Sequence, residues 1–257
     1  MTPAPLLRRP LGASPTDRGH GLRALVSVRD LAEARLVARA GLDLIDLKEP
    51  AQGALGGLAV ADIAAIVAVL RREAPGTPVS ATIGDWPAEA IAVIERQVRR
   101  VEATGVDVVK VGIEPGPAAA ELVDALGALR RGGCPLVPVL LADGPIDDAL
   151  FERLLRQDFA AVMLDTADKR GGTLLQRHPP ERLAALIARL RERGALSGLA
   201  GALRLSDLPT LHRLAPDFAG FRSAVCAGER SGRLDADRLA ALLSGLAQRG
   251  ERVPATA

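Results

Sequence analysis

The stretch DLIDLKEPAQGALGGLAVADIAAIVAVLRREAPGTPVSATIG, residues 43–84, contains the repeating unit that decides the fold. Its first six residues, DLIDLK, form a short apolar run typical of a buried strand. Residues 59–73 then place apolar side chains at helical spacing, and residues 78–84, PVSATIG, return to a short strand-like run. A strand, a helix and a second strand in this order predict a βαβ unit with parallel strands.

The same alternation continues in both directions and predicts eight strand–helix units. The expected strands are residues 24–28, 43–48, 78–84, 107–112, 135–142, 160–166, 196–201 and 217–223. The expected helices are residues 30–40, 59–73, 87–104, 117–131, 145–156, 179–193, 205–214 and 235–248. The chain is therefore predicted to be an α/β protein with a parallel sheet.

Two architectures fit this alternation, a closed (β/α)8 TIM barrel and an open doubly wound sheet. The loops after strands 43–48, 160–166 and 217–223 are long and rich in glycine, whereas the turns that follow the helices are brief. This asymmetry is expected when one face of a barrel carries the site. We therefore predict a single TIM-barrel catalytic domain over residues 22–250.

The two ends of the chain fall outside this pattern. Residues 1–21 are rich in proline, glycine and arginine, without the period of a helix or a strand. They predict a mobile N-terminal extension, and residues 251–257 predict a C-terminal tail.

The composition argues against several classes of partner. A net charge of +2 and an aromatic content of one Trp, four Phe and no Tyr offer neither a basic face nor a stacking surface for nucleic acid. No run approaches the roughly 20 apolar residues of a membrane span. We therefore expect a soluble cytoplasmic protein that binds neither nucleic acid nor membrane, and the sequence leaves open whether copies of the chain form a homo-oligomer.

The cysteines and histidines do not form a metal-binding pattern. Cys134 and Cys226 have no CxxC spacing, and His20, His178 and His212 are scattered along the chain. We expect neither a metal nor another cofactor.

The three lysines of the chain are its most informative residues. Thirty of the 33 basic residues are arginine, and Lys48, Lys110 and Lys169 all fall at or just behind the ends of expected strands. Where charge alone is needed this chain uses arginine, so a retained lysine indicates chemistry that needs a primary amine. A neutral amine attacks a carbonyl to form a Schiff base, and a guanidinium does not.

Two aspartates accompany these lysines on the expected strands. Side chains alternate along a strand, so Asp46 and Lys48 face the same side and are expected to meet at the barrel rim. Lys110 is expected to point into the barrel between two apolar neighbours, and Asp165 ends its strand four residues before Lys169. Burial and neighbouring positive charges both lower the pKa of a lysine. The alternative is that each Asp/Lys pair is a buried ion pair that only closes the core.

The loops after the last two strands predict a phosphate site. LAGALR (199–204) and FRSAVCAGERSGRLD (221–235) occupy the place where TIM barrels commonly bind phosphate through backbone N–H groups. The small residues Gly201, Ala202, Ser223 and Ala224 would let a phosphate approach the backbone closely. Arg222 is expected to add charge, as is Arg230.

Several of these stretches together resemble a known family. They are LIDLKEPAQGALG (44–56), SATIGD (80–85), VVKVG (108–112), VMLDTADKRGGTL (162–174), LAGALR and FRSAVCAGERSGRLD. Over about residues 23–245 the chain resembles the (5-formylfuran-3-yl)methyl phosphate synthase family of methanofuran biosynthesis, also described as 4-(hydroxymethyl)-2-furancarboxaldehyde-phosphate synthase. Gly201-Ala202 stands where archaeal members have Gly-Ser, and Ala227 where they have lysine.

The resemblance implies a TIM-barrel lyase that joins two molecules of glyceraldehyde 3-phosphate, with loss of phosphate and water, to a phosphorylated furan aldehyde. Lys48 falls on the family's Schiff-base lysine, and Asp46, Lys110, Asp165 and Lys169 match its other active-site positions. The Arg-rich composition would suit a bacterial relative that uses the furan cofactor in one-carbon metabolism. Without the resemblance, two other functions stay open: a class I aldolase acting on a phosphorylated sugar, and a non-catalytic barrel that binds a sugar phosphate.

Overall fold

The structure of the protein, a computed structural model, describes residues 22–247. The predicted N-terminal extension and C-terminal tail lie outside these residues. Eight parallel strands close into a barrel in the order β1 to β8, each paired with the next and β1 with β8. The TIM-barrel prediction is therefore confirmed, and the open sheet is excluded.

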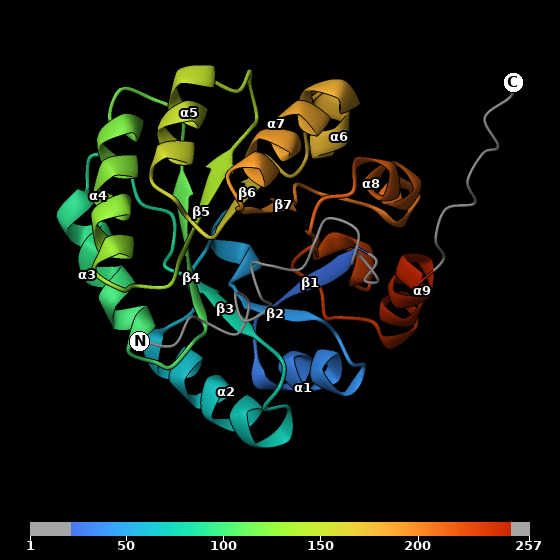
Figure 1. The fold of residues 1–257 in the computed structure, drawn as a ribbon. Coiled ribbons are helices and arrows are strands. Elements are labelled where there is room, and N and C mark those ends of the chain that lie inside the picture. Colours follow the sequence, from blue (N-terminus) through green and yellow to red (C-terminus); the bar gives the residue numbers. More distant parts are fainter. Residues whose placement is uncertain (1–21, 248–257) are drawn as a thin grey trace, which may run out of the picture.

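The strands match the expected runs closely. They are β1 (Arg23–Val28), β2 (Leu44–Leu47), β3 (Val79–Thr82), β4 (Val108–Ile113), β5 (Leu136–Leu141), β6 (Ala161–Asp165), β7 (Leu196–Leu199) and β8 (Phe218–Phe221). Figure 1 shows the helices as an outer ring around this sheet, so each strand is covered on its outer face.

The helices are α1 (Leu31–Arg39), α2 (Val60–Glu73), α3 (Ile91–Glu102), α4 (Ala119–Arg131), α5 (Asp148–Arg156), α6 (Leu174–Arg177), α7 (Pro180–Glu192), α8 (Leu208–Leu214) and α9 (Ala236–Ala247). The helix expected from residue 87 begins instead at Ile91, because residues 87–90 form a separate turn in which the Ala90 N–H donates to the Pro87 carbonyl at 2.9 Å. The short helix α6 in the loop after β6 was not predicted. None of the helices within residues 22–247 is long and apolar enough to span a membrane.

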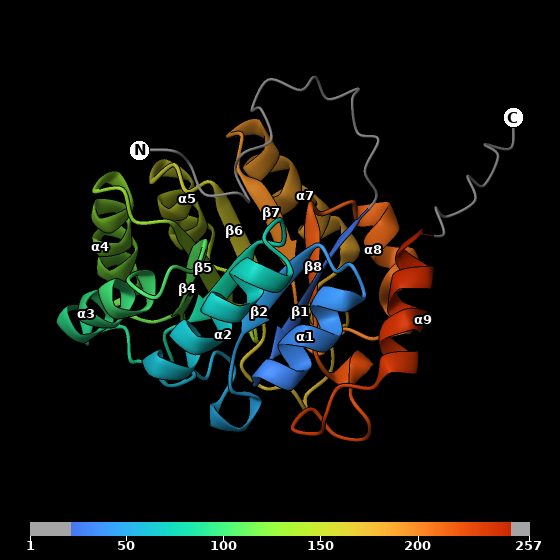
Figure 2. The same ribbon diagram turned by 90° about the horizontal axis from the view of Figure 1, so that it is seen from below.

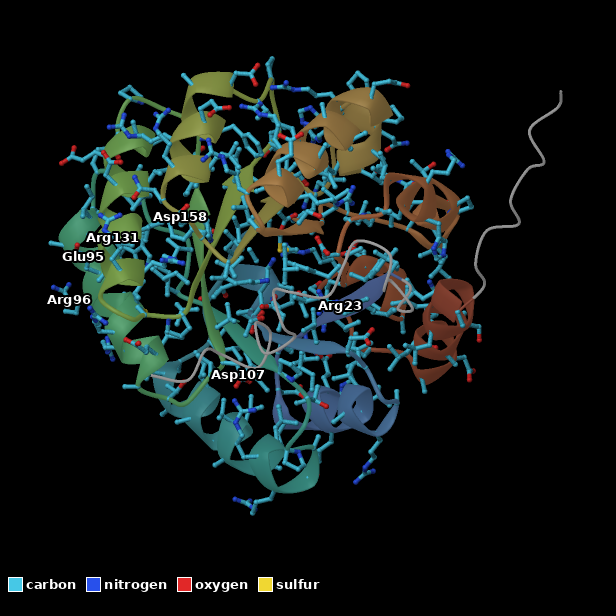
Figure 3. All side chains as sticks on the ribbon, in the orientation of Figure 1. Arg23, Glu95, Arg96, Asp107, Arg131 and Asp158 are labelled. Atoms are coloured by element: carbon cyan, nitrogen blue, oxygen red, sulfur yellow. The ribbon has the colours of Figure 1, made fainter. Side chains whose placement is uncertain are left out.

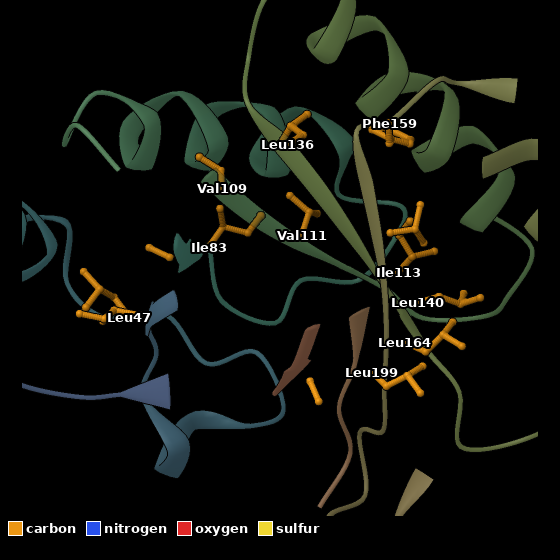
Figure 4. Packing of buried hydrophobic residues seen from close by; sticks show 14 of the residues in the cluster. Leu47, Ile83, Val109, Val111, Ile113, Leu136, Leu140, Phe159, Leu164 and Leu199 are labelled. Carbon is orange, nitrogen blue, oxygen red and sulfur yellow. The ribbon is translucent and has the colours of Figure 1, made fainter. Parts of the chain in front are cut away.

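Two apolar layers hold the barrel together. Outward-facing strand residues pack under the helices, among them Leu47, Val109 and Leu164, and Figure 4 shows this packing from close by. A second, smaller cluster fills the inside of the barrel and includes Leu25 and Val139. The two clusters come from alternate positions along each strand, which is the side-chain alternation of a sheet buried on both faces.

Charged side chains lie mostly on the outside, as Figure 3 shows for Arg96 on α3 and Arg131 at the end of α4. Three aspartates have a structural role at the amino-terminal end of the barrel. Each lies just before one strand and accepts a backbone N–H from the start of the neighbouring strand, at 2.7–2.9 Å. The pairs are Asp43 with Ala24, Asp107 with Val79 and Asp217 with Ser197. These hydrogen bonds satisfy backbone donors where the ladder begins.

Candidate active site

The carboxyl ends of the strands surround a cavity lined mainly by charged and small side chains. In the turned view of Figure 2, the loops after β2 (blue) and β8 (red-orange) lie together at the lower edge of the barrel. All five predicted catalytic side chains line this cavity, namely Asp46, Lys48, Lys110, Asp165 and Lys169. The structure thus brings together residues that lie up to 123 positions apart in the sequence.

The deepest polar layer is an ion pair between Lys110 and Asp46. Lys110 Nζ lies 2.8 Å from Asp46 Oδ1, and the two side chains are 4% and 0% exposed. The Asp46 carboxylate also accepts hydrogen bonds from Ser80 Oγ at 2.7 Å and Ser27 Oγ at 3.0 Å. With three donors this buried carboxylate is well satisfied, which is the condition for a stable buried charge.

This arrangement corrects the predicted pairing of Asp46 with Lys48. The two residues do face the same side of β2, but Asp46 lies one layer deeper, where it meets Lys110 from β4. The carboxylate beside Lys48 is Asp165, with Oδ2 3.7 Å from Lys48 Nζ. Asp165 on β6, and not Asp46, is therefore the ion-pair partner of the Lys48 amine.

Asp165 lies between two amines. Its Oδ1 accepts a hydrogen bond from Lys169 Nζ, which also donates to the Thr166 carbonyl. Burial disfavours the Asp165 carboxylate, but Lys169 and Lys48 attract it more strongly, so the pKa of Asp165 is lowered and the group is ionised at neutral pH.

The Lys48 amine is held in an environment that favours its neutral form. The side chain is 7% exposed, and burial is the main cause that lowers its pKa from 10.5 to about 8. Asp165 opposes this shift, while Lys169 and Lys110 add to it through repulsion. At pH 7 about a tenth of Lys48 is then neutral, against less than a thousandth for an unperturbed lysine. Lys48 is suited to attack a carbonyl.

Arg222 lines the cavity at the predicted phosphate site, and its N–H donors are all bound within the protein. Its guanidinium is buried and makes five hydrogen bonds within the protein: two to the Glu33 carboxylate and one each to the carbonyls of Ser27, Arg230 and Gly232. A guanidinium has five N–H donors, so all of them are occupied. Arg222 therefore holds the loop after β8 in place, and its charge is compensated by Glu33.

The other predicted phosphate residues form the rim of the cavity on the β7–β8 side. Gly201, Ala202 and Ser223 line the cavity itself. Gly201 has φ +109°, and a Cβ there would lie about 3 Å from the Thr166 side chain, so only glycine fits. Ser223 and Ala224 begin the short 3-10 helix η4 (Ser223–Val225), whose first hydrogen bond is donated by Val225. The N–H groups of Ser223 and Ala224 therefore make no hydrogen bond within this helix.

Arg230 is the cation of this rim. It lines the cavity, and it reaches across to the loop after β2, where it donates to the carbonyls of Pro50 at 3.0 Å and Gly53 at 2.9 Å. Asp85 holds the same loop from the other side and accepts the Leu55 N–H at 3.0 Å. Because the Asp85 carboxylate is partly buried, its pKa is raised.

A second cavity adjoins the mouth on the β2–β6 side. Asp85, Glu114 and Trp86 line it, and no lysine or arginine does. The two carboxylates would repel a phosphate dianion from this second cavity.

Sequence reasoning missed two residues that shape the site. Glu33 lies three residues after Asp30, a spacing that indicates a helix cap, and the Asp30 carboxylate does accept the Glu33 N–H at 2.8 Å, while the Glu33 carboxylate accepts the Arg29 N–H at 3.0 Å. Its second role as the partner of Arg222 could not be found from this spacing. Asp85 lies within the quoted SATIGD motif, but nothing in that motif indicates that it binds the loop after β2.

Metal binding has no support in the described residues 22–247, which contain no group of three or more His, Cys, Asp or Glu side chains placed to hold an ion. That no metal is needed stays a prediction.

The fold and the site together define a TIM-barrel enzyme, because three lysines and two aspartates lie at the carboxyl-terminal mouth, the face on which TIM barrels carry their active sites. The family itself follows from comparison with known proteins. Residues 24–243 match the model of the 4-HFC-P synthase family, and the chain belongs to that family.

Individual relatives agree with this family. A protein of Methylorubrum extorquens, provisionally named (5-formylfuran-3-yl)methyl phosphate synthase, is 40% identical over 219 residues, which cover 85% of this chain and 89% of that protein. The (5-formylfuran-3-yl)methyl phosphate synthase of Methanococcus maripaludis strain C5 is 31% identical, covering 83% of this chain and 94% of that protein. The family resemblance inferred from the sequence is confirmed, and the chain is an enzyme.

Solved structures support the fold. Phosphoribosyl anthranilate isomerase from Thermus thermophilus has a TM-score of 0.60 at 20% identity and covers 88% of this chain and 98% of its own. 3-Hexulose-6-phosphate synthase from Salmonella typhimurium has a TM-score of 0.59 at 17% identity, covering 87% and 100%.

Proposed function

We propose that this enzyme joins two molecules of glyceraldehyde 3-phosphate through a Schiff base on Lys48 and releases phosphate and water to form (5-formylfuran-3-yl)methyl phosphate for a methanofuran-type cofactor. The observation that carries the proposal is the buried Lys48 amine, which lines the cavity at the barrel mouth and whose pKa is lowered by burial to about 8. The names of the relatives supply the product.

In the first step the neutral Lys48 amine adds to the carbonyl of one triose phosphate, and the carbinolamine loses water to give an imine. The imine withdraws electrons from the neighbouring carbon, so a proton can leave that carbon and the resulting enamine can attack the aldehyde of the second triose. Asp165 Oδ2, 3.7 Å from Lys48 Nζ, is the carboxylate nearest to these proton transfers.

The later steps expel phosphate from one triose, and a leaving phosphate needs its charge neutralised as the bond breaks. Lys169 is suited to this role because its amine donates a hydrogen bond to the Asp165 carboxylate. The other oxygen of that carboxylate faces the Lys48 amine, so Lys169 lies close to the reacting lysine. The retained phosphate is assigned to the rim formed by Gly201, Ala202, Ser223, Ala224 and Arg230. Arg222 stabilises that rim through its hydrogen bonds to the carbonyls of Arg230 and Gly232.

The proposal is tested by incubating the enzyme with glyceraldehyde 3-phosphate and following near-ultraviolet absorbance together with release of inorganic phosphate. A furan aldehyde absorbs strongly, and phosphate should appear in equal amount. A class I aldolase would stop at a reversible C–C bond, giving neither signal. That outcome would contradict the proposed function while leaving the Schiff base intact.

The rate should depend on pH through Lys48. Because only the neutral amine attacks, we expect kcat/KM to rise with pH and to level off above an apparent pKa of about 8. Below that value each unit of pH should cost about tenfold. Lys110 lowers the pKa of Lys48, so in Lys110→Met the midpoint should move to higher pH. A profile that is flat between pH 6 and pH 9 would contradict the assignment.

Chelation should leave the enzyme active. An imine supplies the electron sink that a metal provides in other aldol-type reactions, so we expect unchanged turnover after dialysis against EDTA. Turnover is measured by furan absorbance before and after addition of Mg²⁺ or Zn²⁺. Loss of activity that a divalent cation restores would favour an enolate held by a metal on Asp46 and Asp165.

A further inference from the structure

The loop that carries Lys169, residues 166–173, is fixed to the end of β5 by one carboxylate. Asp143 follows β5, and its two oxygens accept the N–H groups of consecutive loop residues, Ala167 at 2.6 Å and Asp168 at 2.9 Å. Two backbone donors on one carboxylate fix both the position and the direction of the chain at this point.

Arg177 ties the far end of the loop to the same place. Its guanidinium lies 3.8 Å from the Asp143 carboxylate, donates to the Asp143 carbonyl at 3.3 Å, and donates to the carboxylate and carbonyl of Asp168 at 3.0 and 3.1 Å. Gly171 makes room for this contact, because a Cβ there would collide with the Arg177 guanidinium and the Asp168 carboxylate. His178 adds a further contact to β5, from Nε2 to the Ala142 carbonyl at 2.7 Å.

Lys169 lies inside the segment that these contacts enclose. Its amine must cross from this loop to the Asp165 carboxylate, which ends β6 inside the barrel. A long lysine side chain has many rotamers, so its amine is placed only if its backbone is fixed. Asp143 itself does not line the cavity, and it therefore acts on the reaction through the loop.

We propose that Asp143 is a positioning residue: by holding the Ala167 and Asp168 N–H groups and the Arg177 guanidinium, it places the Lys169 amine on Asp165. The catalytic consequence rests on the proposed function of Lys169, whereas the placement of the amine does not.

The variant Asp143→Asn tests this. An asparagine has the size of the aspartate but only one acceptor oxygen, whereas the Ala167 and Asp168 N–H groups use one oxygen each. The amide N–H₂ of the asparagine would therefore face one of these backbone N–H donors. We expect borohydride trapping on Lys48 to reach the wild-type extent, while furan formation slows about 10²-fold, the cost of a misplaced catalytic group. Asp148→Asn is the matched control, because Asp148 binds Arg182 and Arg189 on the outer helices and should keep the wild-type rate.

A double-mutant cycle with Lys169→Ala separates positioning from a general structural role. If Asp143 acts through Lys169, the double variant should be no slower than Lys169→Ala alone. The proposal would be overturned if Asp143→Asn slowed the wild-type enzyme and the Lys169→Ala enzyme by the same factor. A wild-type rate in the Asp143→Asn enzyme would overturn it as well. Arg177→Gln, which loosens the same loop without changing Asp143, should show the same pattern, and it serves if Asp143→Asn does not fold.

A readout that needs no turnover keeps the two proposals distinguishable. Acetic anhydride labelling of Lys169, measured by peptide mass spectrometry, should rise several-fold in Asp143→Asn and stay at the wild-type level in Asp148→Asn. Unchanged labelling of Lys169 overturns the positioning role. Absence of furan and of trapped imine in the wild type overturns the proposed function alone.

Discussion

The variant Lys48→Arg should fold normally and lose furan formation by about 10⁴-fold or more, the scale seen when a covalent nucleophile is removed. Arginine keeps a positive charge beside Asp165 but cannot condense with a carbonyl. Borohydride reduction in the presence of glyceraldehyde 3-phosphate should add the mass of a reduced triose phosphate to the Lys48 peptide of the wild type and to no peptide of the variant.

The matched control is Lys169→Arg, which changes the other lysine that contacts Asp165. This variant should still form the Lys48 adduct, because the amine that attacks is unchanged. Thermal unfolding of both variants checks that each is folded. If borohydride labels Lys110 or Lys169 in the wild type and leaves Lys48 unmodified, the assignment of the nucleophile is wrong.

The positions of the three lysines could be predicted because strand ends can be recognised from short-range pattern. A run such as VVKVG shows apolar residues on both sides of Lys110, and in a parallel barrel those neighbours face the helices. Closure of the barrel then brings all strand ends to one face. Local sequence was sufficient for this part of the site.

The partners of the lysines could not be predicted in the same way. Asp46 and Lys48 are close in sequence and share a face of β2, yet the stagger between strands places Asp46 level with Ser27 and Ser80. That layer is reached by Lys110 from β4, two strands away. Such pairing depends on the register of the whole barrel, which a single strand does not encode.

Arg222 illustrates a second limit. The sequence places an arginine next to small residues after the last strand, a pattern typical of phosphate binding. In the structure this arginine forms an ion pair with Glu33, which lies 189 residues earlier and compensates its charge. The cation available at the rim is instead Arg230, eight residues further along. Counting donors and acceptors in the folded structure distinguishes the two arginines, and spacing does not.

The variant Lys110→Met should lower the free energy of unfolding by about 3–5 kcal/mol, the cost of leaving a buried charge without its partner. Methionine matches the length of the lysine stem, so packing changes little. The Asp46 carboxylate keeps the two serine hydroxyls but loses the amine at 2.8 Å. Urea unfolding measures the change. Arg35→Met is the control, because Arg35 and Glu73 lie at a similar distance, 2.7 Å, but are 40% and 39% exposed, so the loss of this pair should have a far smaller effect on the free energy of unfolding.

Adding Asp46→Asn to Lys110→Met should restore most of the lost stability. The uncharged asparagine no longer needs a counter-ion, and its carbonyl oxygen still accepts a hydrogen bond from a serine hydroxyl. In the double variant Lys48 would lose both the repulsion from Lys110 and the smaller attraction of Asp46, so its pKa should rise less than in Lys110→Met alone. If Lys110→Met alone is as stable as the wild type, the Asp46 carboxylate does not depend on Lys110, and the buried pair has a role only in tuning Lys48.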